Sequence, residues 1–179
     1  MDADERVRLF CALRLPDDAI VPLVEWQQSE LRCGRLVPAG NLHVTLAFLG
    51  SQPAGELPAI AGVLRTAAAA TDGVRLKVLG YRETRSVGML TLDDEGGRAT
   101  ALARRLHACL EELGVYRREA RPWLPHLTVL RFSATRPMLT PALDSLPPEL
   151  VPSDAAVFIS RLRPGGAQYE VLEIAALGG

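Results

Sequence analysis

Two short segments of this sequence carry the same polar pair, a histidine followed two positions later by a threonine. The first is His43-Val44-Thr45-Leu46 and the second is His126-Leu127-Thr128-Val129. Each segment lies in an alternating run of the kind that forms β-strands, and side chains two positions apart on a strand share a face. Each strand would therefore present an imidazole and a hydroxyl on one side, about 7 Å apart along the strand.

Two imidazoles and two hydroxyls suit phosphoryl transfer without a metal. Histidine titrates near neutral pH, so one ring can take a proton from the attacking oxygen while the other gives a proton to the departing oxygen. Each such transfer contributes roughly 10²–10⁴ in rate. The hydroxyls of Thr45 and Thr128 would donate to the non-bridging phosphate oxygens. His107 lies in a helical pattern without a threonine partner, so we interpret it as a solvated helix residue.

The composition is that of an ordinary globular protein. The chain has 179 residues, of which 48% are hydrophobic and 23% charged, and this length favours a single domain spanning residues 1–179. The net charge of −1 argues against coating nucleic acid through global charge. A local grip on one or two phosphates remains open, and nearly all basic residues are arginines, whose planar forks fit phosphate oxygens.

Neither a metal site nor a disulfide framework is indicated by the cysteines. Cys11, Cys33 and Cys109 are scattered, which fits a reducing cytoplasm. The charged N-terminal residues do not resemble a signal peptide. No apolar run reaches the roughly 18 residues that would suggest a membrane span. We therefore expect a cytoplasmic protein without a membrane anchor.

Hydrophobic periodicity predicts a mixed order of elements, β-α-β-α-β-β-α-β-loop-β-β. Strands are expected at 6–15, 42–49, 74–81, 87–92, 127–132, 155–163 and 168–175. Helices are expected from Pro16-Asp17-Asp18 to Gly34 and at 56–71 and 95–113, and residues 134–153 form a proline-rich loop. The first helix has a stripe made of Ile20, Leu23, Val24, Gln27 and Leu31. Strands that follow one another without a helix favour antiparallel pairing and an α+β fold.

Four segments together resemble a known family. They are residues 8–13, residues 37–50 around the first motif, residues 121–131 around the second, and the closing hairpin at 160–170. The chain resembles the two-histidine phosphoesterase superfamily, and within it the bacterial and archaeal RNA 2',3'-cyclic phosphodiesterases, also called 2'-5' RNA ligases. The resemblance covers nearly the whole chain.

This resemblance implies a bilobal fold, in which two antiparallel sheets face each other across a cleft with pseudo-twofold symmetry and helices on the outside. It implies opening of a ribose 2',3'-cyclic phosphate to a 2'-phosphate, with reversible 2'-5' ligation in some members, and neither metal nor cofactor. In that scheme His43 protonates O3', His126 activates water, and Thr45 and Thr128 bind the phosphate. The implied partner is an RNA end carrying a cyclic phosphate, tRNA-derived ends included, and a monomer is expected.

Three further residues are weaker candidates for the site. Arg131 matches a family arginine, but strand alternation places it on the face away from His126. Phe48 matches a family aromatic, but alternation places it opposite His43, so we interpret it as core first and as a base-stacking residue second. Tyr169 in the closing hairpin could reach the rim of the cleft, although core packing is favoured.

The surroundings of the second motif leave RNA affinity open. Four arginines, Arg117, Arg118, Arg121 and Arg131, crowd it within fifteen residues and form either a solvated face or a funnel for an RNA terminus. Leu124 stands where the family often has a basic residue, and Leu36 where an aromatic is common.

Other functions remain open at this point. The same chemistry could act on small nucleotide or ADP-ribose cyclic phosphates, and the fold could serve as a non-catalytic module that binds RNA ends. A metal hydrolase is poorly supported, because two lone histidines without nearby carboxylates make a poor site.

Overall fold

A computed structural model describes residues 2–133 and 137–178 of the chain. Its strands are β1 Arg6–Arg14, β2 Arg35–Leu36, β3 His43–Pro53, β4 Leu76–Glu83, β5 Val87–Asp94, β6 His126–Arg131, β7 Asp154–Arg163 and β8 Gly166–Ala176. Its α-helices are α1 Asp17–Glu30, α2 Leu57–Ala69 and α3 Arg98–Glu112. Each predicted strand and helix is present with shifted ends. The part of the predicted 134–153 loop at 134–136 lies outside the described residues.

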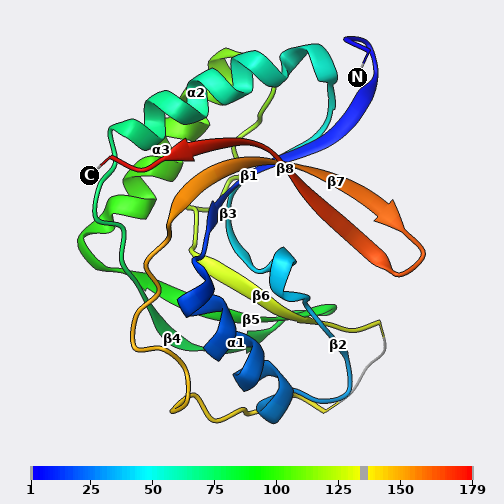
Figure 1. The fold of residues 1–179 in the computed structure, drawn as a ribbon, viewed down its shortest axis with the longest axis vertical. Coiled ribbons are helices and arrows are strands. Elements are labelled where there is room, and N and C mark those ends of the chain that lie inside the picture. The colour runs from blue at the N-terminus through cyan, green and yellow to red at the C-terminus, as the bar shows by residue number, and fades with distance from the viewer. Residues whose placement is uncertain (1, 134–136, 179) are drawn as a thin grey trace.

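The strands form an antiparallel sheet that curls across the molecule, in the order β4-β5-β6-β3-β1-β7-β8, with β2 paired to β6 (Figure 1). The halves on either side are joined through one residue pair, Val44 of β3 with Leu127 of β6. The predicted α+β class with antiparallel strands is confirmed. The two expected sheets meet at this pair, so they form one continuous sheet rather than two separate ones.

The helices α2 and α3 lie side by side, and α1 lies apart from them (Figure 1). Helix α2 packs on β7 and β8, and α3 packs on β3. The α3 stripe Leu102, Leu106 and Leu110 repeats at helical spacing and is fully buried. No helix in the described part of the chain is long and apolar enough to cross a membrane.

His107 is not the solvated residue that the sequence suggested. It is only 6% exposed, and its Nε2 donates a hydrogen bond of 2.8 Å to the backbone oxygen of Leu46. The reason is helical spacing: Ala99, Ala103 and His107 are four residues apart and form a second buried row on α3. Because the alanines are small, this row packs close to the sheet. The imidazole of His107 therefore lies against β3.

The first helix also ends earlier than predicted. It stops at Glu30 rather than near Gly34, and the chain then extends into the short strand β2. Pro16 occupies the position before its first turn, without a side-chain cap. The early stop matters because it brings Arg35 of β2 beside Arg131 of β6.

Candidate active site

The two His-x-Thr motifs meet where β3 and β6 pair. In the antiparallel register that matches Val44 with Leu127, His43 lies across from Thr128 and Thr45 lies across from His126. Val44 and Leu127 are fully buried, so the motif side chains occupy the other face of the sheet. One pocket, called here the motif pocket, is lined by all four: His43, Thr45, His126 and Thr128. Sequence segments far apart thus supply two imidazoles and two hydroxyls to one cavity.

The ring of His43 is held by its own chain. Its Nδ1 lies 2.7 Å from the backbone oxygen of Asn41, and because a carbonyl oxygen only accepts, Nδ1 must donate. In the neutral ring Nε2 is then unprotonated, and it accepts from the hydroxyl of Thr45 at 3.1 Å. The tautomer therefore leaves Nε2 as the atom that can exchange a proton in the pocket.

His126 is fixed in the same way. Its Nδ1 lies 3.0 Å from the backbone oxygen of Leu124, the residue two positions earlier, as Asn41 is for His43. The same reasoning makes Nδ1 the donor and leaves Nε2 available. The side chain of Leu124 differs from the basic residue common in the family, but its backbone oxygen performs the orienting role.

Aromatic rings enclose His43. Its ring centroid lies 4.9 Å from that of Phe10, 5.8 Å from that of Phe158 and 5.4 Å from that of Tyr169. Tyr169 also packs edge-on against Phe10 and lines the motif pocket. Both interpretations of Tyr169, core packing and a place at the cleft, therefore hold.

This enclosure changes the acidity of His43. Burial lowers the pKa of His43 from 6.5 to about 4, against the opposing effect of the hydrogen bond to Asn41, and the nearby charges of His126 and Arg131 lower this pKa further. Removing an imidazolium from water is unfavourable, so the neutral form dominates in the empty site. His43 therefore needs a neighbouring negative charge before it holds a proton at neutral pH.

The expectation that Phe48 belongs to the core is wrong. In the pairing of β1 with β3, Ala12 faces Thr45 and Cys11 faces Ala47, so Leu46 is an extra residue without a partner in that ladder. Such a bulge reverses the alternation of side chains beyond it. Phe48 returns to the face of Thr45, is 63% exposed and lines the motif pocket.

A bulge in β6 likewise brings Arg131 to the motif pocket. In the pairing of β5 with β6, Met89 faces Thr128 and Gly88 faces Leu130, which leaves Val129 as the extra residue. Strand alternation alone had placed Arg131 away from His126, and the bulge corrects this expectation. Arg131 is exposed and lines the motif pocket.

Two further residues shape the site and were missed as site residues from the sequence. The guanidinium of Arg35 donates to the backbone oxygen of Gly165, and the amide of Asn41 donates to the backbone oxygen of Ala167 at 3.0 Å. These bonds tie β2 and the segment before β3 to the β7–β8 hairpin across the pocket mouth. Gly166 has a φ of +116°, a backbone conformation that favours glycine, and a Cβ there would also require the guanidinium of Arg35 to shift.

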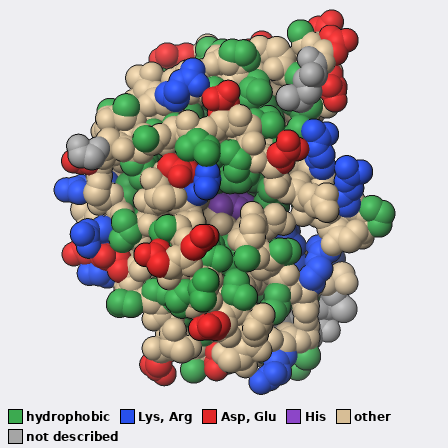
Figure 2. Space-filling model, viewed as in Figure 1, with side chains coloured by type: hydrophobic (Ala, Val, Ile, Leu, Met, Phe, Trp, Pro, Cys, Tyr) green, Lys and Arg blue, Asp and Glu red, His purple; other side chains and the backbone are tan. Residues whose placement is uncertain are grey.

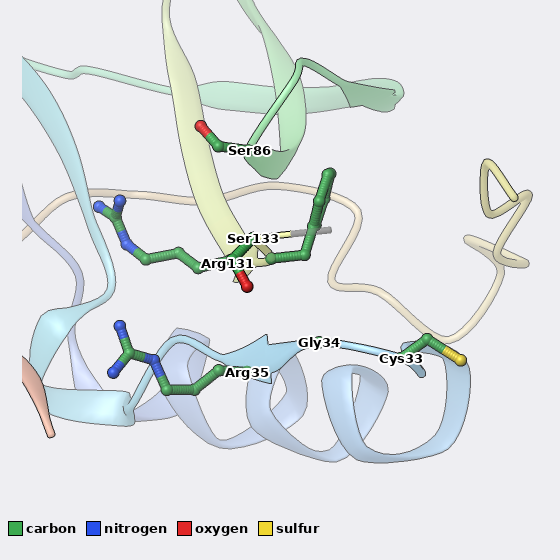
Figure 3. Close-up of a pocket in the computed structure, with 7 residues that line it drawn as sticks. Cys33, Gly34, Arg35, Ser86, Arg131 and Ser133 are labelled. Atoms are coloured by element: carbon green, nitrogen blue, oxygen red, sulfur yellow. The ribbon is translucent and has the colours of Figure 1, made fainter. Parts of the chain in front are cut away.

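A larger hollow adjoins the motif pocket, and we call it the outer hollow. It encloses about 490 Å³ and is lined by Cys33, Gly34, Arg35, Ser86, Arg131, Phe132 and Ser133. Arg35 and Arg131 line both cavities. Figure 3 shows their guanidinium groups extending in the same direction from facing strands, and Figure 2 shows a histidine in a depression near the centre of one face. The two guanidinium groups form a cationic border shared by the two cavities.

The other arginines near the second motif behave differently. Arg118 pairs with Glu111 at 3.0 Å and Arg121 pairs with Glu119 at 2.9 Å. Both side chains are exposed, and neither these two nor Arg117 is among the residues that line the two cavities. A solvated face therefore describes these three residues better than a funnel does.

Comparison with known proteins identifies relatives along the whole chain. The family model of the 2'-5' RNA ligase superfamily matches residues 15–165. A protein from Thermus thermophilus with the name RNA 2',3'-cyclic phosphodiesterase is 35% identical, and the alignment covers 97% of this chain and 91% of that protein. An Escherichia coli protein of the same name is 31% identical over 71% of this chain and 73% of its own length.

Solved structures share the fold. The apo form of E. coli LigT superposes with a TM-score of 0.78 at 25% identity, covering 98% of this chain and 99% of that one. LigT in complex with NADP+ gives a TM-score of 0.75 at 27% identity and the same coverage. TT0787 of T. thermophilus gives 0.75 at 32% identity, covering 96% of this chain and 98% of that one. By sequence and by structure, the chain belongs to the 2'-5' RNA ligase superfamily.

Proposed function

We propose that this protein is an RNA 2',3'-cyclic phosphodiesterase that uses two histidines as acid and base. The observation that carries the proposal is the equivalence of the two imidazoles. Each has its Nδ1 bound to the carbonyl two residues earlier, each has a threonine at the second position after it, and both line one pocket. The names of the relatives support the same activity.

The bond changes follow from this arrangement. Nε2 of His126 takes a proton from water as the water oxygen attacks phosphorus. The bond from phosphorus to O3' breaks, and His43 gives its proton to O3', so the product carries a 2'-phosphate and a free 3'-hydroxyl. Thr45 and Thr128 donate hydrogen bonds to the non-bridging oxygens, where negative charge increases in the transition state. Attack by a 5'-hydroxyl in place of water gives a 2'-5' linkage.

The low pKa of His43 makes its donor role depend on the substrate. In the empty site the ring is neutral at pH 7 because its pKa is about 4. A phosphodiester anion next to Nε2 offsets the burial and the repulsion from His126 and Arg131, and it raises the pKa towards neutrality. Binding of the anion therefore protonates His43, and O3' receives this proton when it leaves.

The cationic border favours an RNA end over a small cyclic nucleotide. Arg35 and Arg131 line both the motif pocket and the outer hollow, so they can contact the cyclic phosphate of either substrate, but only an RNA chain has a preceding phosphate that can contact them from the outer hollow as well. Arginine forks suit such oxygens. The exposed ring of Phe48 offers a surface on which a base can stack. The structure of LigT with NADP+ is consistent with nucleotide binding in this fold.

A substrate with sulfur in place of the bridging O3' tests the assignment of roles. A thiolate leaves without a proton from the enzyme, since a thiol is a much stronger acid than an alcohol. On the ordinary cyclic phosphate, His43→Ala and His126→Ala should each lose roughly 10²-fold or more in rate. On the sulfur substrate His43→Ala should recover most of its rate, while His126→Ala should not. Recovery by His126→Ala instead would reverse the roles, and recovery by neither would contradict acid–base catalysis by this pair.

A further inference from the structure

The two bulges that turn Phe48 and Arg131 into the site occupy equivalent places. The extra residue is Leu46 in β3 and Val129 in β6, and each is the third residue after its motif histidine. In both strands the fifth residue after the histidine is thereby returned to the face of the motif pocket. Those residues are Phe48 and Arg131, so the composition of the pocket wall depends on both bulges.

A buried polar side chain from a helix binds the carbonyl of each extra residue. His107 of α3 donates from Nε2 to the oxygen of Leu46 at 2.8 Å. Gln27 of α1 donates from Nε2 to the oxygen of Val129 at 2.7 Å. The same amide of Gln27 also reaches the oxygen of Val37 at 3.1 Å.

These two side chains are exceptional in their burial. Within residues 2–133 and 137–178, the buried polar side chains are Gln27, Thr45, Thr71 and His107. Thr45 belongs to the motif, and Thr71, just past the end of α2, donates to the oxygen of Ala67 in that helix. The other two both end on a bulge carbonyl, although their helices lie apart in the fold (Figure 1). Burying an amide or an imidazole is costly unless it is hydrogen-bonded, so each side chain favours the backbone geometry that provides its acceptor.

We propose that Gln27 and His107 are positioning residues that hold the two bulges and thereby direct Arg131 and Phe48 to the substrate. The proposal rests on the proposed function, because it assigns these side chains to binding of the nucleotide end. Neither residue lines the motif pocket, so neither is placed in contact with the reacting atoms. Their loss should weaken binding through Phe48 or Arg131 and leave the proton transfers of the histidines largely intact.

The test compares His107→Phe and Gln27→Met, which keep bulk and remove the donor, with Thr71→Val as the matched control. Thr71→Val also removes buried hydrogen bonds, those of the Thr71 hydroxyl with the oxygen of Ala67 and with Arg105, and Thr71 is not among the residues that line the two cavities. We expect KM for a cyclic-phosphate RNA to rise about tenfold in the first two variants with kcat within about threefold of wild type. The control should lose stability without a change in KM. His107→Gln, which retains a donor, should recover part of the loss.

Double variants show whether the rise in KM depends on Phe48 and Arg131. In a Phe48→Ala background, His107→Phe should raise KM little further, whereas Gln27→Met should retain its full effect. The converse should hold in an Arg131→Ala background. Equal effects in all backgrounds, or a rise in KM for Thr71→Val as large as for the other two, would overturn the proposal.

A readout without substrate separates this proposal from the proposed function. Hydrogen exchange should accelerate in residues 44–50 of His107→Phe and in residues 126–132 of Gln27→Met, each without the other. Unchanged exchange in both segments would refute the positioning role even if the enzyme is active. Local acceleration in a protein whose wild type opens no cyclic phosphate would instead refute the proposed function and preserve the role of the two residues in holding the bulges.

Discussion

Replacing His43 with glutamine should remove part of the acid sensitivity of the fold. The folded protein holds this ring with a pKa of about 4, while the unfolded chain protonates it at about 6.5. As the pH falls from 6.5 to 4, the unfolded state therefore binds this proton before the folded state does. The free energy of unfolding must decrease over that window, because stability rises with pH wherever the unfolded state binds more protons.

The size of the effect follows from the shift. A full shift from 6.5 to about 4 corresponds to roughly 3 kcal/mol, and at pH 5 roughly 2 kcal/mol of this is lost. This share of the free energy of unfolding is fully present above pH 6.5 and fully lost below pH 4. Glutamine is uncharged throughout, so His43→Gln cannot show this component.

Urea unfolding followed by circular dichroism at pH 7 and pH 5 measures the difference. The wild type should lose about 2 kcal/mol more than His43→Gln between the two pH values. The carboxylates are the same in both proteins, so their contributions cancel, and the difference between the two losses reports on the ring of His43 together with its interaction with His126. If both proteins lose the same free energy of unfolding between pH 7 and pH 5, His43 is not neutral in the empty site. The substrate would then not be needed to protonate it.

Three other outcomes follow from the same structure. The rate of turnover against pH should be bell-shaped, because one motif histidine must be neutral and the other charged; a flat profile from pH 5 to 9 would argue against paired roles. Arg131→Ala should raise KM for RNA more than for a mononucleotide cyclic phosphate, by a margin that shrinks with salt, whereas Arg65→Ala, whose side chain pairs with Glu173, should not. Iodoacetamide with mass spectrometry should label exposed Cys33 and spare Cys11, whose pKa burial raises to about 12; labelling of both at equal rates would contradict the burial.

Much of the site could be predicted because its signals are local. Alternating residues indicated both motif strands, and a repeated His-x-Thr needs only the two-residue period of a strand to place imidazole and hydroxyl together. The turn at 164–166 likewise indicated the closing hairpin. These features depend on a few neighbouring residues.

The sequence did not predict the position of a side chain where that position depends on pairing or packing with a distant segment. A bulge is defined by the register of two strands, so the alternation around Leu46 and Val129 gave no sign that Phe48 and Arg131 would change face. The burial of His107 required knowing that α3 docks its alanine row on β3. Arg35 gave no signal of its own, since its place depends on pairing with Arg131.

Two imidazoles that act on one phosphate should open the cyclic phosphate without help from a metal. Product analysis on an RNA ending in a 2',3'-cyclic phosphate, with excess chelator present, tests this mechanism. We expect sustained turnover to a single product that carries the phosphate on the 2'-oxygen. A 3'-phosphate, a mixture of both isomers, or loss of turnover in the chelator would contradict it.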